Sequence, residues 1–374
     1  MKRKRLRQGY TTGTCAQAAV KAAVQMLLSG KTISEIQAEL PGGRHLTLPV
    51  FDACIQFSES IPSGYPVSAS CAVKKDSGDD PDITNGILVY GKVRWKDTPG
   101  IVIDGGEGVG RVTKPGLEQP VGAAAINRVP RQMIEREVKT ALEESGCFRG
   151  ICVEVSVPGG EKLALKTFNP RLGIEGGLSI LGTSGIVEPM SEQALVDTIR
   201  AEMRVKLAEG QRCLIVTPGN YGLEFLKKAF KIEETDVVKC SNYIGQAVDM
   251  AIEEGCEKLV LAGHIGKLIK VSGGIMNTHS KWADCRMELF AAAALRAGVK
   301  GERAAEFLEC VTTDEALEKC SGKERERIME QVMKSIEKYL TYRSGEEMDI
   351  GAVVYSNLYG ILGRTENVER LMGI

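Results

Sequence analysis

The second half of the chain alternates short apolar runs with longer helical patterns, and this alternation restricts the possible folds more than any other feature. The apolar runs are Cys213–Thr217, Val237–Cys240, Lys258–Ala262 and Ala352–Tyr355. Helical patterns precede or separate these runs, at 191–207, 281–297, 303–309 and 324–340. Two further helical patterns are expected, one that begins at 223 and one that ends at 254. Buried strands joined by helices build a parallel sheet that is covered on both faces. We therefore expect a doubly wound α/β domain here.

The first half has a different pattern, with strand-like runs between turns rich in Gly, Pro and Asp. Strands are expected at 45–51, 67–73, 87–95 and 151–157, and helices at 15–28 and 133–144. Many strands with few helices are typical of an α+β layer. A stretch rich in small residues, Gly173–Gly185, ends this half. We place the boundary there, with an α+β domain at 1–185 and the parallel-sheet domain at 186–374.

Charge and cysteine content exclude several classes of function. Forty-eight basic residues balance 49 acidic residues, so no net field attracts nucleic acid or a membrane surface. No apolar run approaches the roughly 20 residues of a membrane span. The 11 cysteines lack the spacing of a disulfide framework or a zinc site, which indicates reduced thiols in a cytoplasmic protein. With three histidines, His45, His264 and His279, we expect no histidine-rich metal site.

The stretch "TTGTC", residues 11–15, stands directly before an alanine-rich helical pattern. A helix N-terminus offers unpaired N–H groups that bind carboxylates and phosphates well. Thr14 is the expected cap, and Gly13 would permit a close approach of a ligand. A thiol at the position of Cys15 would have a lowered pKa. The alternative, a capped helix with a small buried cysteine, stays open.

Two further stretches follow expected parallel strands, which is where such sheets bind ligands. The first is "VTPGNYG", residues 216–222, and Asn242 follows the next strand. A glycine turn that opens a helix suits a nucleoside or an amino-acid carboxylate, although an ordinary strand–helix turn remains the alternative. The second, residues 262–284, contains His264 and His279 with several glycines and lysines. Flexible polar loops of this kind seldom exist for packing, so we favour a functional role over imidazoles that merely bond to backbone.

Two segments of the first half concentrate charge. Residues 104–134 combine a glycine-rich turn with Arg111, Lys114, Arg128 and Arg131, which suits a ligand rich in carboxylates. A solvated surface loop is the alternative. Residues 74–84, "KKDSGDDPDIT", contain four aspartates, the residue type that binds hard cations. Turn chemistry explains these aspartates without a metal, and we prefer that interpretation.

These motifs belong to a longer set that resembles the CbiD family, the cobalt-precorrin-5B C(1)-methyltransferases of anaerobic cobalamin biosynthesis. The resemblance runs in order along the chain through "GYTTGTCAQAAVKAA", "KKDSGDDPDIT", "GGEGVGRVTKPGL", "PVGAAAINRVPRQMI", "TFNPRLGIEGGLSILGTSGIVEPMSEQAL", "TPGNYG", "GHIGKLIKVSGGIMNTHSKWAD" and "YGILGR". Strings of this length are far more specific than a glycine fingerprint.

The resemblance implies a methyltransferase that moves the methyl group of S-adenosylmethionine to ring carbon 1 of cobalt-precorrin-5B, giving cobalt-precorrin-6A. It implies an α+β domain on the corrinoid side and a Rossmann-like domain on the S-adenosylmethionine side. Cobalt arrives only as part of the substrate, and no protein-held metal is implied. Because the macrocycle bears many carboxylates, the substrate-binding residues implied are Thr11, Thr12, Gly13, Thr14, Arg111, Lys114, Arg128, Arg131 and Lys267.

The same resemblance places the methyl donor at the loops of the second domain. The residues implied are Gly219, Asn220, Tyr221, Gly222, Asn242, Gly263 and Gly266. The catalytic candidates are His279, His264 and Ser280. One of the two histidines is the expected proton acceptor, because an imidazole titrates near neutrality. Neither nucleic acid nor a membrane is an expected partner, and a homo-oligomer stays open.

Two other functions remain alternatives. The first is a cysteine-dependent acyl or amide transferase, with Cys15 as the nucleophile and His279 as its base. The second is a carrier that holds a corrinoid without changing it.

Overall fold

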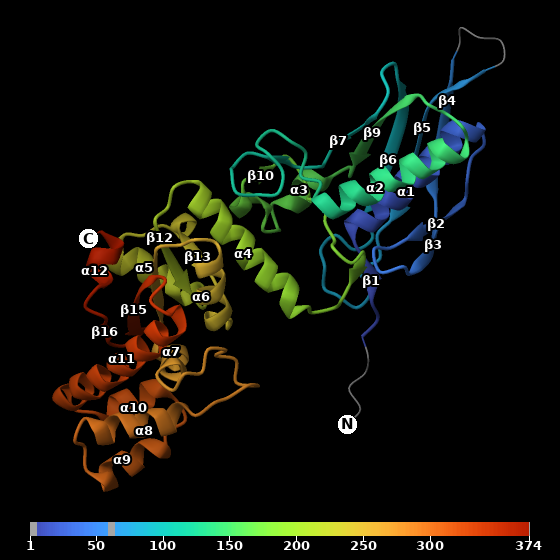
Figure 1. Cartoon of the computed structure of the whole chain (residues 1–374). Coiled ribbons are helices and arrows are strands. Elements are labelled where there is room, and N and C mark those ends of the chain that lie inside the picture. The colour runs from blue at the N-terminus through green and yellow to red at the C-terminus, as the bar shows by residue number, and fades with distance from the viewer. Residues whose placement is uncertain (1–5, 59–63, 374) are drawn as a thin grey trace. The chain divides into compact units, whose positions relative to one another are not determined.

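The computed structural model describes residues 6–58 and 64–373 and divides the chain into two compact units, Met1–Glu192 and Gln193–Ile374. Each unit contains strands and helices around a hydrophobic core of its own, so the chain has a mixed α/β fold (Figure 1). The units divide seven residues after the boundary that we placed from the sequence. Within the described ranges, every helix is too short or too polar to cross a membrane.

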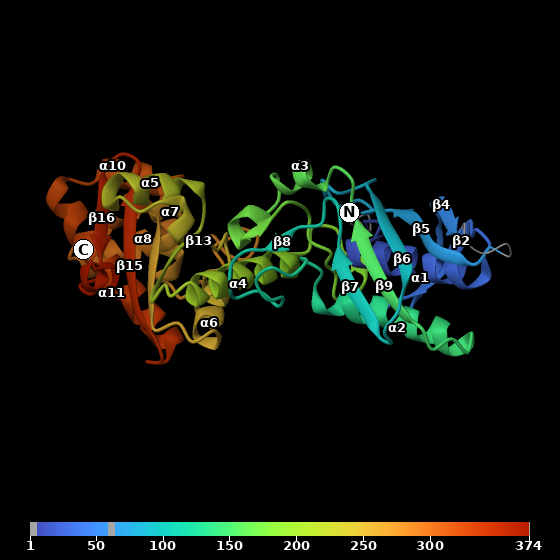
Figure 2. The same ribbon diagram turned by 90° about the horizontal axis from the view of Figure 1, so that it is seen from above.

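The first unit is built on a five-stranded sheet with the order β4-β5-β6-β9-β7 (Figure 2). Its strands are β4 (Phe51–Phe57), β5 (Pro66–Lys74), β6 (Leu88–Lys96), β9 (Gly150–Ser156) and β7 (Ile101–Gly105). All neighbours are antiparallel except β7 and β9. The single strand expected at 45–51 was wrong. The chain leaves β3 (His45–Pro49), which pairs with β2 (Glu35–Glu39), and enters β4 of the larger sheet.

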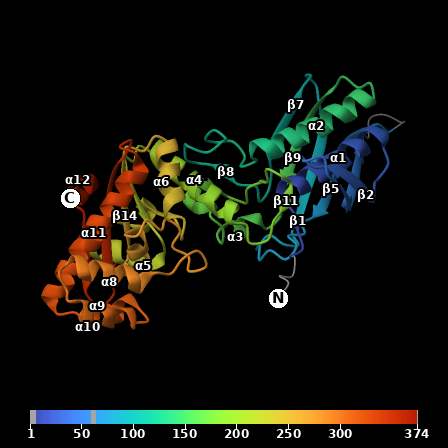
Figure 3. The same ribbon diagram turned by 60° about the horizontal axis from the view of Figure 1, so that its bottom comes forward.

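Two helices, α1 (Thr12–Ser29) and α2 (Arg128–Glu144), pack against each other beside this sheet (Figure 3). Helix α1 contacts β5 and β6, and most of its residues are buried. A Cβ atom at Gly91 in β6 would lie 2.6 Å from the backbone nitrogen of Val20 in α1. Small side chains on both elements therefore let α1 approach the sheet closely. Both helices begin earlier than expected, because their first turns carry no apolar periodicity.

Short elements complete the first unit. Strand β1 (Gly9–Tyr10) pairs with β11 (Ile186–Val187), and β8 (Arg111–Val112) pairs with β10 (Ile174–Glu175). The helical turns α3 (Gly160–Ala164) and η1 (Asn169–Leu172) lie between β9 and β10 in the sequence. Strand β11 and the loop before it bring residues 178–187 back to the start of α1.

The second unit contains a five-stranded sheet with the order β13-β12-β14-β15-β16. Its strands are β13 (Val237–Lys239), β12 (Cys213–Thr217), β14 (Lys258–His264), β15 (Asp349–Ser356) and β16 (Gly360–Arg364). The first four are parallel, and β16 is antiparallel to β15. The four apolar runs noted in the sequence are therefore four adjacent parallel strands.

Helices cover both faces of this sheet. Leu214 and Val216 of β12 point into a core shared with α4, α6, α7, α8 and α11, whereas Ile215 points into a core shared with α5 and α12. The helices are α4 (Glu192–Ala208), α5 (Asn220–Phe230), α6 (Ile244–Glu253), α7 (Ile265–Val271), α8 (Arg286–Arg296), α9 (Gly301–Leu308), α10 (Thr313–Lys319), α11 (Gly322–Ser344) and α12 (Val368–Met372). Helices α8, α9 and α10 gather beside α11 (Figure 3). The helix expected at 281–297 begins only at Arg286, because Cys285 adopts a left-handed conformation.

Candidate functional site

The start of α1 is occupied by the chain itself. Thr11, and not Thr14 as expected, caps the helix, since its hydroxyl accepts from the Thr14 N–H at 3.2 Å. The Gly13 N–H donates to the Leu181 carbonyl at 3.0 Å, and the Thr14 hydroxyl donates to the Gly185 carbonyl at 2.7 Å. The Thr12 hydroxyl also bonds to the backbone of Leu181. All four residues from Thr11 to Thr14 are buried. Their polarity therefore serves to attach the loop at 179–185, and we leave them out of the ligand site.

Cys15 follows one of the two interpretations given for this stretch, a small buried cysteine in a capped helix, and the lowered thiol pKa of the other interpretation is wrong. Its side chain is fully buried, and burial raises the pKa of the thiol to about 12. A buried thiol of this kind is neither accessible nor ionised near neutral pH. Cys15 is therefore unsuited to the role of nucleophile that a cysteine-dependent transferase requires.

The basic residues of the first unit differ in how free they are. Arg131 donates to the carbonyls of Ile126 and Ile103, both at 2.9 Å, and burial lowers the pKa of its guanidinium. Arg111 forms a two-pronged ion pair with Asp104, with the shorter bond at 2.6 Å. Arg128 is exposed in the first turn of α2, and Lys114 is half-buried. Arg131 thus stabilises local structure, whereas Arg111 and Arg128 can reach solvent.

The aspartate-rich segment at 74–84 is a turn, as preferred. Asp82 forms an ion pair with the buried Lys75 and bonds to Thr84, and Asp76 pairs with Arg7. No group of residues in the described parts of the chain has the arrangement of a metal site.

In the second unit, the loops expected to hold the methyl donor meet at the carboxyl edge of the parallel sheet. The turn between β12 and α5 contains Gly219, and Gly266 lies in the first turn of α7, which follows β14 directly. These strands are neighbours, and the Lys267 ammonium donates to the Pro218 carbonyl at 3.4 Å. Burial lowers the pKa of Lys267. The strand order also reverses here, since β13 and β14 lie on opposite sides of β12, and ligands bind at such points in open α/β sheets.

Gly222 allows α5 to begin close against β12. A Cβ atom at this position would lie 1.8 Å from the Thr217 hydroxyl oxygen. Gly219, at the start of the same helix, has extended backbone and open space around it. Asn220 accepts a long bond of 3.4 Å from Lys239, and the Tyr221 side chain is exposed. Gly263 fits closely for a different reason, because a Cβ atom there would meet the Leu268 side chain at 2.8 Å.

His264 caps α7 with its side chain. Its Nδ1 accepts from the Gly266 N–H at 3.1 Å, and its Nε2 faces an Asp314 carboxylate oxygen at 3.6 Å. Burial lowers the pKa of His264, and the Asp314 charge opposes that shift. In the neutral imidazole one nitrogen accepts and the other carries the proton, so the proton lies on Nε2 toward Asp314. Nδ1 is committed to the cap, whereas Nε2 has no hydrogen-bond partner among the described residues. His264 would accept a proton at Nδ1 only by giving up the cap, so this arrangement does not favour it as a proton acceptor.

The other two catalytic candidates lie on the loop between α7 and α8. His279 and Ser280 are exposed, and the His279 Nδ1 accepts from the Lys281 N–H at 3.0 Å. The neighbouring Thr278 is buried and bonds to Asn242 through its hydroxyl at 3.1 Å and through its N–H at 3.0 Å. The structure thus joins Asn242, expected at the donor site, to the loop that carries His279.

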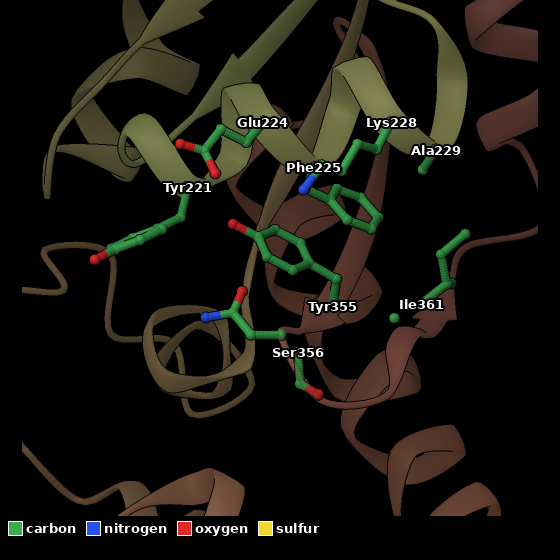
Figure 4. A pocket seen from close by; sticks show the side chains of 10 residues that line it. Tyr221, Glu224, Phe225, Lys228, Ala229, Tyr355, Ser356 and Ile361 are labelled. Carbon is green, nitrogen blue, oxygen red and sulfur yellow. The ribbon is translucent and has the colours of Figure 1, made fainter.

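Sequence reasoning missed a cavity of about 420 Å³ beside α5. Its wall includes Tyr221, Glu224, Phe225 and Lys228 from α5, with Tyr355 and Ser356 from β15 (Figure 4). Phe225 stacks on Tyr355, with ring centroids 4.0 Å apart and planes at 7°. Burial, and then the Glu224 charge, raise the pKa of Tyr355 to about 12. The spacing of residues 221, 224, 225 and 228 places them on one face of a helix, which was a usable sign of a shared surface. Only the tertiary structure brings Tyr355 to that face.

Glycine loops and a cavity at the carboxyl edge of a parallel sheet are typical of α/β proteins that bind small molecules. Comparison with known proteins narrows this class. Residues 1–189 match the CbiD family, and residues 277–366 match the C-terminal domain of CbiD. The chain belongs to the CbiD family.

Individual relatives cover most of the chain. It is 43% identical over 371 residues to the cobalt-precorrin-5B C(1)-methyltransferase of Alkaliphilus metalliredigens, covering 99% of this chain and 95% of the relative. It is 47% identical over 357 residues to the enzyme of that name from Ruminiclostridium cellulolyticum, covering 95% and 90%. The crystal structure of the cobalamin biosynthesis protein CbiD from Archaeoglobus fulgidus is 28% identical, covers 75% of this chain and 84% of that protein, and has a TM-score of 0.38.

Proposed function

We propose that this chain is a methyltransferase that transfers the methyl group of S-adenosylmethionine to C-1 of cobalt-precorrin-5B, giving cobalt-precorrin-6A. The observation that carries the proposal is the similarity to relatives named cobalt-precorrin-5B C(1)-methyltransferase over nearly the whole chain. Cobalt enters as part of the substrate.

The parallel-sheet unit, which we interpret as Rossmann-like, binds the methyl donor in this proposal. Gly219 and Gly222 lie at the start of α5, Gly263 lies near the end of β14, and Gly266 lies in the first turn of α7, all at one edge of its sheet. Asn242 lies at the same edge, since β13 is the neighbour of β12. S-adenosylmethionine supplies an activated methyl group, so the protein's contribution is to hold and align two ligands and to exclude water.

The α+β unit provides the corrinoid side. Arg111 and Arg128 are its accessible cations in the segment predicted to bind carboxylates, with Lys114 beside them in the sequence. A guanidinium binds a carboxylate through two parallel hydrogen bonds, and Arg111 already holds Asp104 in this way. A substrate carboxylate would compete with Asp104 for Arg111. Arg131 is excluded from this role by its bonds to backbone carbonyls.

His279 is our proposed proton acceptor, because it is exposed, whereas His264 is half-buried and uses its Nδ1 to cap α7. Acceptance at Nδ1 requires that its bond to the Lys281 N–H opens. We expect His279→Ala to lower kcat by roughly 100-fold or more, the usual scale for a general base, while leaving the Kd for S-adenosylhomocysteine unchanged. His45→Ala, on β3 of the other unit, is the matched control. Equal turnover in His279→Ala and wild type would contradict the role.

The function is tested by anaerobic incubation of the purified protein with cobalt-precorrin-5B and methyl-labelled S-adenosylmethionine, followed by mass spectrometry of the corrinoid. Label in the corrinoid together with S-adenosylhomocysteine is the expected result. An unchanged corrinoid mass, with the substrate shown to be active with another family member, would refute the activity. Binding of the corrinoid without a mass change would indicate a carrier instead.

A further inference from the structure

The cavity beside α5 has the position and the volume of a ligand site. Helix α5 starts at the carboxyl end of β12, and Tyr355 lies opposite His264 at the carboxyl end of β15. The cavity is therefore at the edge where parallel sheets bind ligands. Its volume of about 420 Å³ is within the range of roughly 300–1,000 Å³ that is typical of small-molecule pockets.

The wall of the cavity is partly rigid and flat. Tyr355 is 2% exposed, and its ring is held between Phe225, which stacks on it, and His264, which meets it edge-on at 5.6 Å. Ser356 is also buried, and its hydroxyl accepts from the Tyr359 N–H at 2.9 Å, which fixes the turn into β16. The Tyr221 ring is 71% exposed and lines the same cavity, so it is the aromatic face that a planar ring such as a nucleobase can reach.

The charges around this surface favour a nucleoside over a polycarboxylate. Glu224 projects from α5 on the side of the Tyr355 hydroxyl (Figure 4). Among the described residues, Glu224 has no ion-pair partner, so its carboxylate remains available. A carboxylate accepts hydrogen bonds from vicinal ribose hydroxyls, whereas it repels the acetate and propionate groups of a corrinoid. Lys228, one turn further along α5, gives the cavity a cationic end.

We propose that the cavity between α5 and the β15–β16 turn binds the adenosine part of the methyl donor, with Glu224 accepting from the ribose hydroxyls. This inference rests on the proposed function, because it takes S-adenosylmethionine as the donor. It extends the donor site from the glycine turn at 219–222 to the far end of the sheet edge, at β15. The exposed ring of Tyr221 lies between these two parts, since Tyr221 belongs to both.

Calorimetric titration of the full-length protein tests the proposal with three probes, S-adenosylhomocysteine, adenosine and the polycarboxylate corrinoid cobyrinic acid. Glu224→Gln keeps the size of the side chain and removes its charge. We expect it to weaken S-adenosylhomocysteine and adenosine by the same factor, roughly tenfold or more, which is the scale of a hydrogen bond to a charged group. Its affinity for cobyrinic acid should equal that of wild type. The matched control is Glu337→Gln, an exposed glutamate on α11.

A second variant tests the space instead of the charge. Ala229 is exposed at the rim of the cavity, so Ala229→Trp should fill it without disturbing the core and should weaken both adenosine-containing probes. Circular dichroism checks that both variants are folded. Wild-type affinity for S-adenosylhomocysteine in both variants, in a protein that methylates the corrinoid, would overturn the inference and leave the function standing. A wild type that neither binds S-adenosylhomocysteine nor methylates would refute both. Weaker binding of cobyrinic acid alone would assign the cavity to the corrinoid and overturn the inference.

Discussion

Two glycines at the edge of the parallel sheet matter because they lack a side chain, but for different reasons. Gly222 has no side chain, and the buried hydroxyl of Thr217 fills that place without a hydrogen-bond partner among the described residues. Gly219, three residues earlier, has nothing within 4 Å of a hypothetical Cβ atom. Two glycines of the same turn therefore differ: one is required by packing, and the other leaves space beside the start of α5.

This difference predicts opposite outcomes for two alanine variants. Gly222→Ala should lower the free energy of unfolding by roughly 1–3 kcal/mol, because α5 must move away from β12 to relieve the contact with Thr217. Gly219→Ala should leave stability within about 0.5 kcal/mol of wild type, because its extended backbone suits any residue. Urea denaturation followed by circular dichroism measures both. Equal stability of the two variants would show that α5 does not rest on Thr217.

Cysteine reactivity provides a second test at this scale. Cys15 is fully buried with a raised pKa, whereas Cys54 and Cys285 are exposed. We expect iodoacetamide to label Cys54 and Cys285 in the native protein at pH 7.5 and to leave Cys15 unmodified until the chain is unfolded. Peptide mass mapping after timed labelling measures the order. Rapid native labelling of Cys15 accompanied by loss of activity would restore the cysteine-transferase alternative.

At the scale of elements, capping side chains connect helices that are distant in the sequence. His264 caps α7 and faces Asp314 in the first turn of α10, so one imidazole contacts two helix starts. In α1 the same principle attaches the loop at 179–185, whose carbonyls accept from Gly13 and Thr14. These bonds explain polar residues at helix starts without a ligand.

The cap predicts a pH-dependent stability. Burial lowers the pKa of His264 below its ordinary value of 6.5, so the folded state favours the neutral imidazole. The unfolded chain therefore binds a proton first as the pH falls. The contribution of the neutral His264 imidazole to the free energy of unfolding is complete above about pH 7. It is lost as the pH falls from the pKa of His264 in the unfolded chain toward its lower pKa in the folded chain.

His264→Asn should preserve the cap and remove this titration, because asparagine caps helices well. We expect the free energy of unfolding, measured in urea from pH 7.5 to 5.5, to fall less steeply in the variant than in wild type. His45→Asn, on β3, controls for the loss of a histidine as such. Parallel pH profiles for wild type and His264→Asn would contradict the assignment.

At the scale of the whole molecule, the chain has two compact units that respond to different ligands in our proposal. Donor binding to the unit at 193–374 should stabilise that unit, by about 2.7 kcal/mol when S-adenosylhomocysteine is present at 100 times its Kd. The unit at 1–192 should gain nothing directly from it.

The two tryptophans allow this prediction to be measured. Trp282→Phe leaves Trp95 in β6 as the only tryptophan, so its fluorescence follows the first unit while circular dichroism follows both. S-adenosylhomocysteine should raise the urea midpoint seen by circular dichroism and leave the Trp95 midpoint unchanged. A shift of the Trp95 midpoint alone would place the donor in the α+β unit.

The sequence by itself was sufficient for the parallel strands of the second unit, because continuous apolar runs have few other uses in a soluble fold. The sequence also located the glycines that follow these strands, and the carboxyl ends of parallel strands lie at one edge of the sheet. It failed for the strand expected at 45–51, because a one-residue step between two sheets leaves no mark in the hydrophobic pattern.

Tertiary structure decided which polar residues are free. Arg131 and Arg128 look equivalent in the sequence, but carbonyls of a neighbouring strand and loop surround only Arg131. The threonines at 11–14 likewise bond to a segment about 170 residues away, and the Nε2 of His264 faces Asp314, 50 residues further along the chain. The cavity formed by α5 and β15 could not be predicted from the sequence, because its two walls come from segments that are distant in the chain. Local sequence determines which groups can bond, whereas the partner is determined by contacts between distant segments, which exist only in the folded chain.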